Sequence, residues 1–191
     1  MENKEKLRKM YKNKIAGINL SERKKADREI CEKIIKKPVI KKSKNVMIYI
    51  SREDEVDTKN IIDILISSGK NIYVPVTTDT EIKISRLKNM DDLIKGKFGI
   101  LEPRPEHREY ISHECLDVVI VPGLCFTTKG RRLGRGGGYF DRFLKKIMPK
   151  TKIIGICYSS QIEDLLPKEK YDVDMDEVIT DSQLNKGGKK C

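Results

Sequence analysis

The chain has 191 residues, of which 38% are hydrophobic and 36% charged, and it carries a formal net charge of +11. A chain of this length usually forms one domain, and its core is large enough to need no disulfide or structural metal. No apolar segment approaches the ~20 residues of a membrane span, and the N-terminus lacks the apolar block of a secretory signal. We therefore expect a single cytoplasmic domain over residues 1–191, without a membrane partner.

The cysteines and histidines predict neither a zinc site nor a disulfide framework. The five cysteines form no CxxC pair, and the chain has only two histidines. Reduced thiols are the simple interpretation of an odd cysteine count in an intracellular protein.

Positive charge is concentrated near the N-terminus. The first 44 residues hold 16 Lys and Arg against 6 Asp and Glu, whereas the rest of the chain holds 24 against 23. Such a run could bind polyanions non-specifically, could guide an anionic small substrate, or could be the solvated face of two helices. Composition alone leaves these three interpretations open.

The first 37 residues predict a helical hairpin. Between residues 3 and 16, apolar side chains recur every three or four positions, as on one face of a helix. A second apolar stripe follows Gly17, with Ser21 placed as its N-cap and Pro38 as its end.

The pattern then changes to strands that alternate with helices. Residues 46–51 and 71–76 are rich in β-branched residues, and between them Thr58 can cap a helix that ends near Gly69. A strand, a helix and a strand in this order are typical of a parallel sheet covered by helices.

A second unit of the same kind follows. The apolar run at 118–121 predicts a strand buried on both faces, residues 138–148 a helix, and residues 152–159 the next strand. Residues 81–87 predict an additional strand, and residues 98–109 a proline-bearing surface loop. We expect an α/β fold: a three-layer sandwich with a mostly parallel central sheet, an N-terminal helical hairpin and a frayed tail.

The most informative stretch is residues 121–144, where a buried strand leads into a helix. Open α/β sheets bind ligands at such junctions. Four glycines within residues 134–138 let the backbone approach a ligand and turn its amides toward an anion, although such loops are also plain turns. Arg131, Arg132 and Arg135 add donors suited to phosphate. The spacing matches neither the P-loop nor GxGxxG, so it predicts a phosphate site without a standard nucleotide fingerprint.

Acidic residues at three places could supply oxygen ligands or hydrogen-bond acceptors. Asp141 falls one turn into the helix after the glycines, where it would either compensate the helix dipole or help to hold Mg²⁺. Asp172 alternates with Asp174 and Asp176 along a short strand that could equally be solvated surface. Glu55 follows the first strand and could simply belong to a helix cap. The residues themselves do not decide between a structural and a functional role for Asp141, Asp172 and Glu55.

The string GRRLGRGGGYFDR at residues 130–142 resembles the central motif of the 5-formyltetrahydrofolate cyclo-ligase family, also called 5,10-methenyltetrahydrofolate synthetase. Further matches are VPG at 121–123, EVDT at 55–58, FGILEP at 98–103, KxxLR at 4–8, and the spaced residues Gln161, Pro167, Asp172 and Asp176. The resemblance covers nearly the whole chain, and the chain length fits the family.

The resemblance implies an ATP- and Mg²⁺-dependent conversion of 5-formyltetrahydrofolate into 5,10-methenyltetrahydrofolate, with release of ADP and phosphate. A formamide oxygen is a poor leaving group, so transfer of the γ-phosphoryl group onto it would let N10 close the ring. Such catalysis depends on positioning and charge neutralisation, which agrees with the lack of a convincing Cys/His or Ser/His pair. The implied enzyme is a monomer that binds small molecules and no nucleic acid.

The resemblance also implies roles for individual residues. The implied ATP-binding residues are Lys4, Arg8, Arg132, Leu133, Gly134, Arg135, Gly136, Gly137, Gly138, Tyr139 and Phe140. The implied folate-binding residues are Ile50, Glu55, Arg135, Gly136, Gly137, Gly138 and Tyr139. Arg135 and Tyr139 would act in catalysis, with Arg135 stabilising the migrating phosphoryl group. Asp141 and Asp172 would hold Mg²⁺.

The chain departs from the family pattern at three positions. Phe140 stands where a second tyrosine is common, so a hydroxyl group is lost while the aromatic face remains. Gly137 stands where some members carry lysine, and no tryptophan lies near Phe98. Neither a lysine nor a tryptophan contact is therefore expected here.

Two other classes of function stay open. A phosphosugar isomerase or CoA-transferase-like enzyme would bind a substrate phosphate at the glycines and consume no ATP. A basic RNA-binding module would bind with steep salt dependence, but only 6% of the residues are aromatic, and Asp141 and Asp172 would have no role. ATP-dependent turnover separates these alternatives from the ligase.

Overall fold

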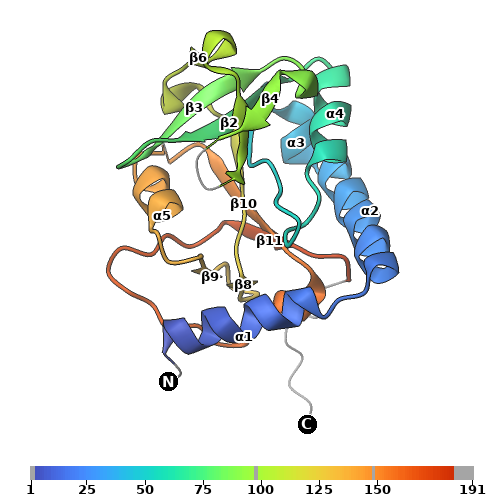
Figure 1. Ribbon diagram of the computed structural model, residues 1–191, viewed down its shortest axis with the longest axis vertical. Coiled ribbons are helices and arrows are strands. Elements are labelled where there is room, and N and C mark those ends of the chain that lie inside the picture. The colour runs from blue at the N-terminus through green and yellow to red at the C-terminus, as the bar shows by residue number, and fades with distance from the viewer. Residues whose placement is uncertain (1–2, 97–98, 148, 183–191) are drawn as a thin grey trace.

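The computed structural model describes residues 3–96, 99–147 and 149–182 (Figure 1). The α-helices are α1 (Lys4–Ala16), α2 (Leu20–Lys36), α3 (Pro38–Lys42), α4 (Lys59–Ser67) and α5 (Tyr139–Leu144). The strands are β1 (Asn45–Ile48), β2 (Asn71–Thr77), β3 (Ile82–Leu87), β4 (Leu93–Lys95), β5 (Leu101–Pro103), β6 (Glu109–Tyr110), β7 (Val118–Val121), β8 (Cys125–Phe126), β9 (Arg132–Leu133), β10 (Lys152–Ile156) and β11 (Glu177–Ile179). Short 3₁₀ turns are η1 (Met90–Asp92), η3 (Pro105–His107), η4 (His113–Cys115) and η5 (Ser159–Gln161).

The central sheet has seven strands in the order β11-β10-β7-β1-β2-β3-β6. The strands from β11 to β2 run parallel, and β3 and β6 continue the sheet antiparallel at one edge. The parallel register sets Val46 opposite both Ile72 and Val118. The carboxyl ends of the parallel strands therefore lie at one edge of the sheet, and the predicted mostly parallel α/β fold is confirmed.

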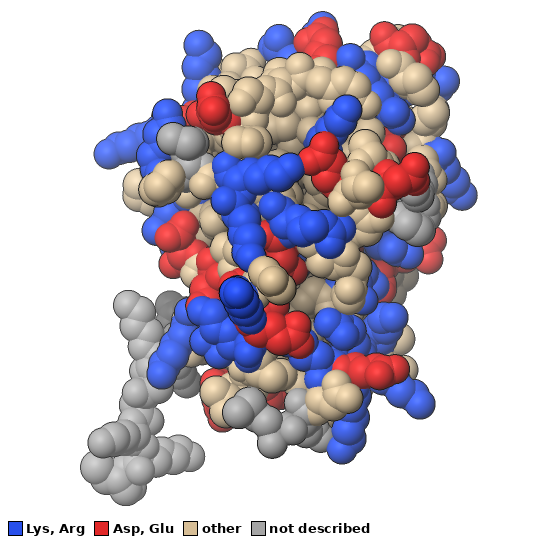
Figure 2. Space-filling view, turned by 90° about the vertical axis from the view of Figure 1, so that its left-hand side faces the viewer, with Lys and Arg blue, Asp and Glu red and all other residues tan. Residues whose placement is uncertain are grey.

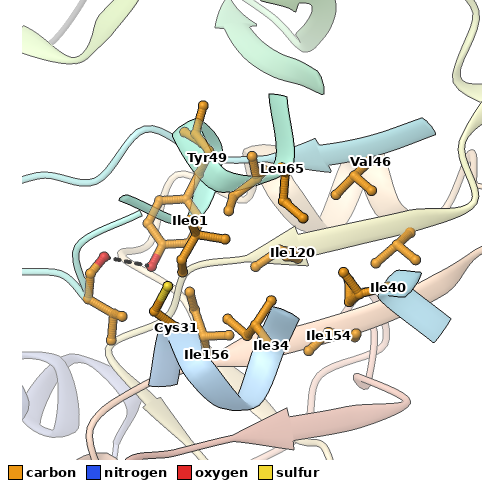
Figure 3. Close-up of a cluster of buried hydrophobic side chains, with 14 of the residues drawn as sticks. Cys31, Ile34, Ile40, Val46, Tyr49, Ile61, Leu65, Ile120, Ile154 and Ile156 are labelled. Carbon is orange, nitrogen blue, oxygen red and sulfur yellow. Dashed lines mark hydrogen bonds between the residues drawn. The ribbon is translucent and has the colours of Figure 1, made fainter. Parts of the chain in front are cut away.

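Successive residues of the inner strands point to opposite sides, and both sides are apolar. Helices therefore cover both faces of this sheet. Val118 and Ile120 pack into the core formed with α2, α3 and α4. Figure 3 shows Ile120 in this core. Val119 and Val121 pack on the other face, in the cluster that contains Phe143 of α5. Among the described helices, even the 17-residue α2 lacks the length and apolar character that a membrane span requires.

The two predicted N-terminal helices are present, but they do not pack along each other as a hairpin. Leu7, Tyr11 and Ile15 of α1 pack against a small cluster around Leu124 and Leu133 of the β8–β9 region. The buried residues of α2 belong to the main core instead. Figure 1 shows α1 across the lower end of the molecule and α2 running up one side. The apolar stripes were correct, but each packs on a different partner.

Local boundaries differ from the predictions in several places. The cap of α2 is Asn19 rather than Ser21, because the Asn19 side chain accepts the Glu22 amide at 2.9 Å. The helix after the glycines ends at Leu144, since the chain then continues in tighter turns. The three aspartates of the alternating run precede β11 and are not part of it. The proline-bearing segment contains β5 and β6, while Phe98 and the predicted frayed tail lie outside the described residues.

Candidate functional site

A cavity of about 730 Å³ lies at the carboxyl ends of the parallel strands, where open α/β sheets bind ligands. It receives residues from α1, from the loops after β1 and β7, from the end of β2 and from the segment before β11. Every site residue implied by the family resemblance lines it: Lys4, Arg8, Ile50, Glu55, Arg132, Leu133, Gly134, Arg135, Gly136, Gly137, Gly138, Tyr139, Phe140, Asp141 and Asp172. The fold thus brings together positions as far apart in sequence as Lys4 and Asp172.

The glycine loop, residues 134–138, forms one wall of the cavity. Gly136 has φ = 110° and Gly138, which precedes α5, has φ = 66°. These left-handed conformations are easily adopted only by glycine. A side chain at Gly134 would approach the Arg132 guanidinium at 3.0 Å. Backbone conformation and close packing therefore explain the glycines without reference to a ligand, and the backbone itself faces the cavity.

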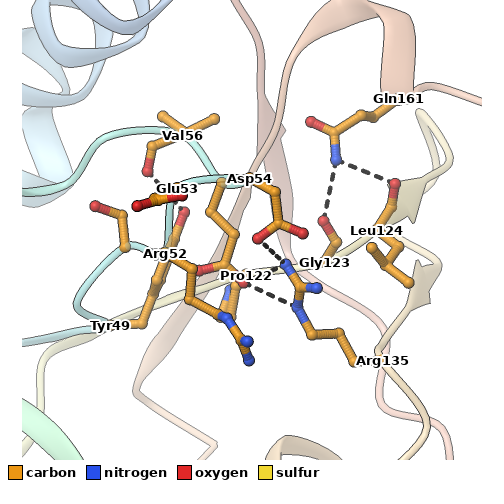
Figure 4. Close-up of polar contacts among 12 residues, drawn as sticks. Tyr49, Arg52, Glu53, Asp54, Val56, Pro122, Gly123, Leu124, Arg135 and Gln161 are labelled. Atoms are coloured by element: carbon orange, nitrogen blue, oxygen red, sulfur yellow. Dashed lines mark hydrogen bonds and ion pairs between the residues drawn. The ribbon is translucent and has the colours of Figure 1, made fainter. Parts of the chain in front are cut away.

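Arg135 extends from the glycine loop to two carboxylates of the loop after β1 (Figure 4). Its guanidinium donates to Glu55 Oε1 from Nε at 3.1 Å and from Nη2 at 3.0 Å, and to Asp54 Oδ1 at 2.8 Å. Burial lowers the pKa of Arg135, but the two carboxylates outweigh burial and raise the pKa above its ordinary value. The Arg135 side chain is 30% exposed and that of Glu55 is 9% exposed. A permanently charged donor and a nearly buried acceptor therefore meet in the cavity wall.

Arg132 is enclosed far more tightly than Arg135, with only 4% of its side chain exposed. Its guanidinium lies 2.9 Å from Asp141 Oδ1, donates to the Pro122 carbonyl at 3.2 Å and stands 5.8 Å above the Phe140 ring. Its Nε is buried without a hydrogen-bond partner. Arg132 therefore fixes Asp141 at the base of the cavity.

Arg131, which the sequence offered as a third donor, does not line the cavity. Its guanidinium donates to the Leu166 carbonyl at 3.3 Å and lies 3.6 Å from Asp174 Oδ1. Arg131 precedes β9, and its guanidinium is directed toward Leu166 and Asp174 rather than toward the cavity. The expectation for Arg131 was wrong for this reason.

Helix α1 brings two cationic side chains to the cavity. Lys4 Nζ donates to both carboxylate oxygens of Asp172, at 3.0 and 2.7 Å, and Arg8 Nε donates to the Gly134 carbonyl at 3.0 Å. Burial raises the pKa of Asp172, but Lys4 and the Glu169 amide outweigh it and hold the pKa below its ordinary value. Asp172 is therefore ionised at neutral pH and ties α1 to the segment before β11.

Asp141 and Asp172 line the same cavity and suit Mg²⁺ rather than a tightly caged metal. Magnesium usually takes one or two protein carboxylates together with water and phosphate oxygens. No cluster of three or more metal-ligating side chains occurs among the described residues. The carboxylates now pair with Arg132 and Lys4, so a bound ion would share them with these cations. The donor set fits an ion that arrives with phosphate groups.

Sequence reasoning missed several lining residues, namely Tyr49, Arg52, Pro75, Thr77, Ile82, Ile100, Pro122, Gly123, Arg142, Lys145, Glu169 and Tyr171. Arg142 carried a usable signal, because it lies one turn after Gly138 in a helix that begins at the site. Figure 2 shows Lys and Arg gathered on the side of the molecule that carries α5. The residues from β2 carried no such signal, since only sheet order places the end of that strand here.

Comparisons with known proteins identify the family. The sequence model of the 5-formyltetrahydrofolate cyclo-ligase family matches residues 1–181. A probable 5-formyltetrahydrofolate cyclo-ligase of Caenorhabditis elegans is 31% identical over 94% of this chain and 93% of its own length. The cyclo-ligase of Escherichia coli is 30% identical over 77% of this chain and 83% of its own length.

Solved structures agree on the fold as well. The NMR structure of Aquifex aeolicus 5,10-methenyltetrahydrofolate synthetase superposes with a TM-score of 0.84 at 32% identity, covering 94% of this chain and 90% of that one. A 5,10-methenyltetrahydrofolate synthetase from Mycoplasma pneumoniae gives 0.77 at 25% identity, covering 95% and 100%. Sequence and fold thus agree, and the chain belongs to the 5-formyltetrahydrofolate cyclo-ligase family, whose members are ligases of folate one-carbon metabolism.

Proposed function

We propose that this chain uses ATP and Mg²⁺ to cyclise 5-formyltetrahydrofolate to 5,10-methenyltetrahydrofolate, releasing ADP and phosphate. The observation that carries the proposal is the convergence of the glycine loop, the Arg135–Glu55 pair and the Lys4–Asp172 pair on one cavity. Its volume of about 730 Å³ lies within the range of small-molecule sites.

Cationic side chains and backbone amides would bind the nucleotide phosphates. Lys4 and Arg8 come from α1, and Arg8 already contacts the glycine loop through the Gly134 carbonyl. Bound Mg²⁺ would neutralise phosphate oxygens, and Asp141 and Asp172 are the residues that would hold it. Arg132, enclosed behind Asp141, would act on the nucleotide mainly by fixing that carboxylate.

The loop after β1 would bind the folate. Glu55 offers a carboxylate that can accept hydrogen bonds from ring N–H groups of the pterin, and Ile50 adds an apolar surface beside it. Tyr139 presents an aromatic face, with the Arg142 guanidinium 4.8 Å from its ring centre. Folate and nucleotide would therefore meet at Arg135, which contacts Glu55 and belongs to the glycine loop.

The reaction needs two displacements. The formyl oxygen attacks the γ-phosphorus and the bond to ADP breaks, which converts that oxygen into part of a phosphate leaving group. N10 then attacks the formyl carbon, the carbon–oxygen bond breaks, phosphate departs and N10 loses its proton. Arg135 would offset the negative charge that develops on the transferred group, a role worth 10²-fold or more in other enzymes.

The test is the absorbance of the methenyl product in the near ultraviolet, with 5-formyltetrahydrofolate, Mg²⁺ and ATP. We expect growth that needs ATP and that Arg135→Ala reduces by about 100-fold or more. Arg131→Ala is the matched control, because it removes a guanidinium from the same segment that does not line the cavity. If folded wild-type protein forms no product with ATP, the proposed reaction is wrong.

A further inference from the structure

The loop after β1, residues 49–58, has no regular secondary structure, although it carries Glu55 into the cavity. Backbone N–H and C=O groups in such a segment must be satisfied by side chains or by water. One such contact is internal: the Tyr49 hydroxyl lies 3.4 Å from the Val56 carbonyl (Figure 4). Thr58 adds further contacts within the loop, because its hydroxyl accepts the Ser51 amide at 2.9 Å and donates to the Tyr49 carbonyl at 2.8 Å. Additional support comes from other parts of the chain.

Three side chains from outside the loop hold its backbone. Arg23 Nη2, from α2, donates to the Glu53 carbonyl and, at 3.2 Å, to the Glu55 carbonyl. The Asp57 amide donates to Asp27 Oδ1, also of α2, at 3.1 Å. The Tyr158 hydroxyl, which follows β10, lies 3.2 Å from the same Glu55 carbonyl. Both sides of Glu55 are thereby fixed to the body of the protein.

These three side chains also contact one another. Arg23 Nε donates to the Tyr158 hydroxyl at 3.3 Å, and its guanidinium lies 5.7 Å from the centre of the Tyr158 ring. The Tyr158 hydroxyl donates to Asp27 Oδ1 at 2.9 Å. Burial raises the pKa of Tyr158 above its ordinary value, so the phenol keeps its proton. The network is therefore an ordered unit of one cation, one carboxyl group and one bridging phenol.

Glu55 is the residue where this network meets the cavity. Its backbone carbonyl faces Arg23 and Tyr158, while its side chain accepts the Arg52 amide at 3.0 Å and the Arg135 guanidinium. Within the described part of the chain, none of the three supporting residues lines the cavity. They can act on a ligand only through the loop that carries Glu55, and two of them contact the Glu55 carbonyl directly.

We propose that Arg23, Asp27 and Tyr158 are positioning residues that fix the Glu55 carboxylate for folate binding. The inference rests on the proposed function, which assigns the folate to Glu55. The nucleotide side depends on different contacts, from α1 and the glycine loop. Loss of the network should therefore weaken the binding of 5-formyltetrahydrofolate and leave ATP binding nearly unchanged.

The test compares KM values for the two substrates in the intact enzyme. We expect Arg23→Ala to raise KM for 5-formyltetrahydrofolate about tenfold, because it removes charge-assisted hydrogen bonds to two carbonyls, and to change KM for ATP less than twofold. Tyr158→Phe removes only the hydroxyl group and should raise the folate KM about threefold. Arg28→Ala, on an exposed part of the same helix, is the control and should change neither value.

Thermal unfolding and direct titration with 5-formyltetrahydrofolate in the absence of ATP complete the test. Weaker folate binding by Tyr158→Phe at unchanged thermal stability supports the proposal even where Arg23→Ala folds poorly. An unchanged folate KM in both variants overturns it, as does an equal rise of both KM values. Failure of the proposed function looks different, because the wild-type protein would then form no methenyl product.

Discussion

Two walls of the cavity are built in different ways. The glycine loop is contiguous in sequence, and its shape is set by the backbone, with φ of 110° at Gly136 and 66° at Gly138. Helix α1 is far away in sequence and is held there by side chains, through the apolar contacts of Leu7 and Tyr11 and the ion pair of Lys4. Replacement of a single glycine should therefore disrupt the structure of the wall that the backbone defines. Loss of a single side-chain contact should weaken the attachment of α1 only in part.

The largest expected effect comes from the turn that leads into the glycine loop. Gly130 has φ = 90°, and a Cβ there would lie 2.1 Å from the Met175 carbonyl oxygen, so the backbone itself would have to move. We expect Gly130→Ala to lower the free energy of unfolding by about 3 kcal/mol or more, or to prevent folding. Denaturant unfolding is the measurement.

Gly69→Ala is the matched control for this prediction. Gly69 has a similar φ of 80°, but its Cβ would meet nothing within 4 Å, so only the conformational cost of about 1–2 kcal/mol remains. Equal losses in the two variants would show that the contact with Met175 is unimportant.

The same contrast explains what could be predicted from sequence. The glycine loop was found because its glycines and arginines lie within a few residues of one another. The residue types alone could not separate Arg131 from Arg132 and Arg135, because only the folded chain shows that the last two line the cavity and the first does not. The family resemblance, rather than periodicity, was needed to place Lys4 in the site.

The docked parts of the molecule were harder to predict. An apolar stripe shows which face of α1 is buried but not which partner buries it, so a hairpin with α2 was expected instead of contact with the β8–β9 region. The contact between Arg23 and Tyr158 joins positions 135 residues apart. Neither residue belongs to a motif, and only the folded sheet brings them together.

The next largest effect concerns helix α1, the wall that side chains hold in place. Lys4→Ala should raise KM for ATP about tenfold, because one charge-assisted contact to phosphate is lost, and should leave KM for folate nearly unchanged. Steady-state kinetics with each substrate varied in turn is the measurement. Lys9→Ala, exposed on the same helix, should leave both values unchanged. A complete loss of activity in Lys4→Ala would show that α1 is as indispensable as the glycine loop.

A smaller effect is expected where α1 is fastened to the fold. The Tyr11 hydroxyl donates to Glu163 Oε2 at 2.5 Å, and burial raises the pKa of Tyr11 so that it remains a donor. Tyr11→Phe should lower the free energy of unfolding by about 1–2 kcal/mol, since Glu163 loses a partner. The matched change Tyr110→Phe, at an exposed tyrosine, should have little effect in the same unfolding experiment. Similar losses in both would mean that this hydrogen bond does not fasten α1.

The smallest effect is the pH dependence of the stability that the Lys4–Asp172 contact of α1 contributes. Because the pKa of Asp172 lies below its ordinary value in the folded protein, the Lys4 contact contributes stability at every pH above the ordinary carboxyl pKa of about 3.9. That contribution disappears only as the pH falls through the lower, folded value. The difference in unfolding free energy between wild type and Asp172→Asn should therefore be constant from pH 5 to 8 and shrink below about pH 4. A difference that already shrinks near pH 6 would mean that burial outweighs Lys4, so that α1 would loosen under mildly acidic conditions while the glycine loop kept its shape.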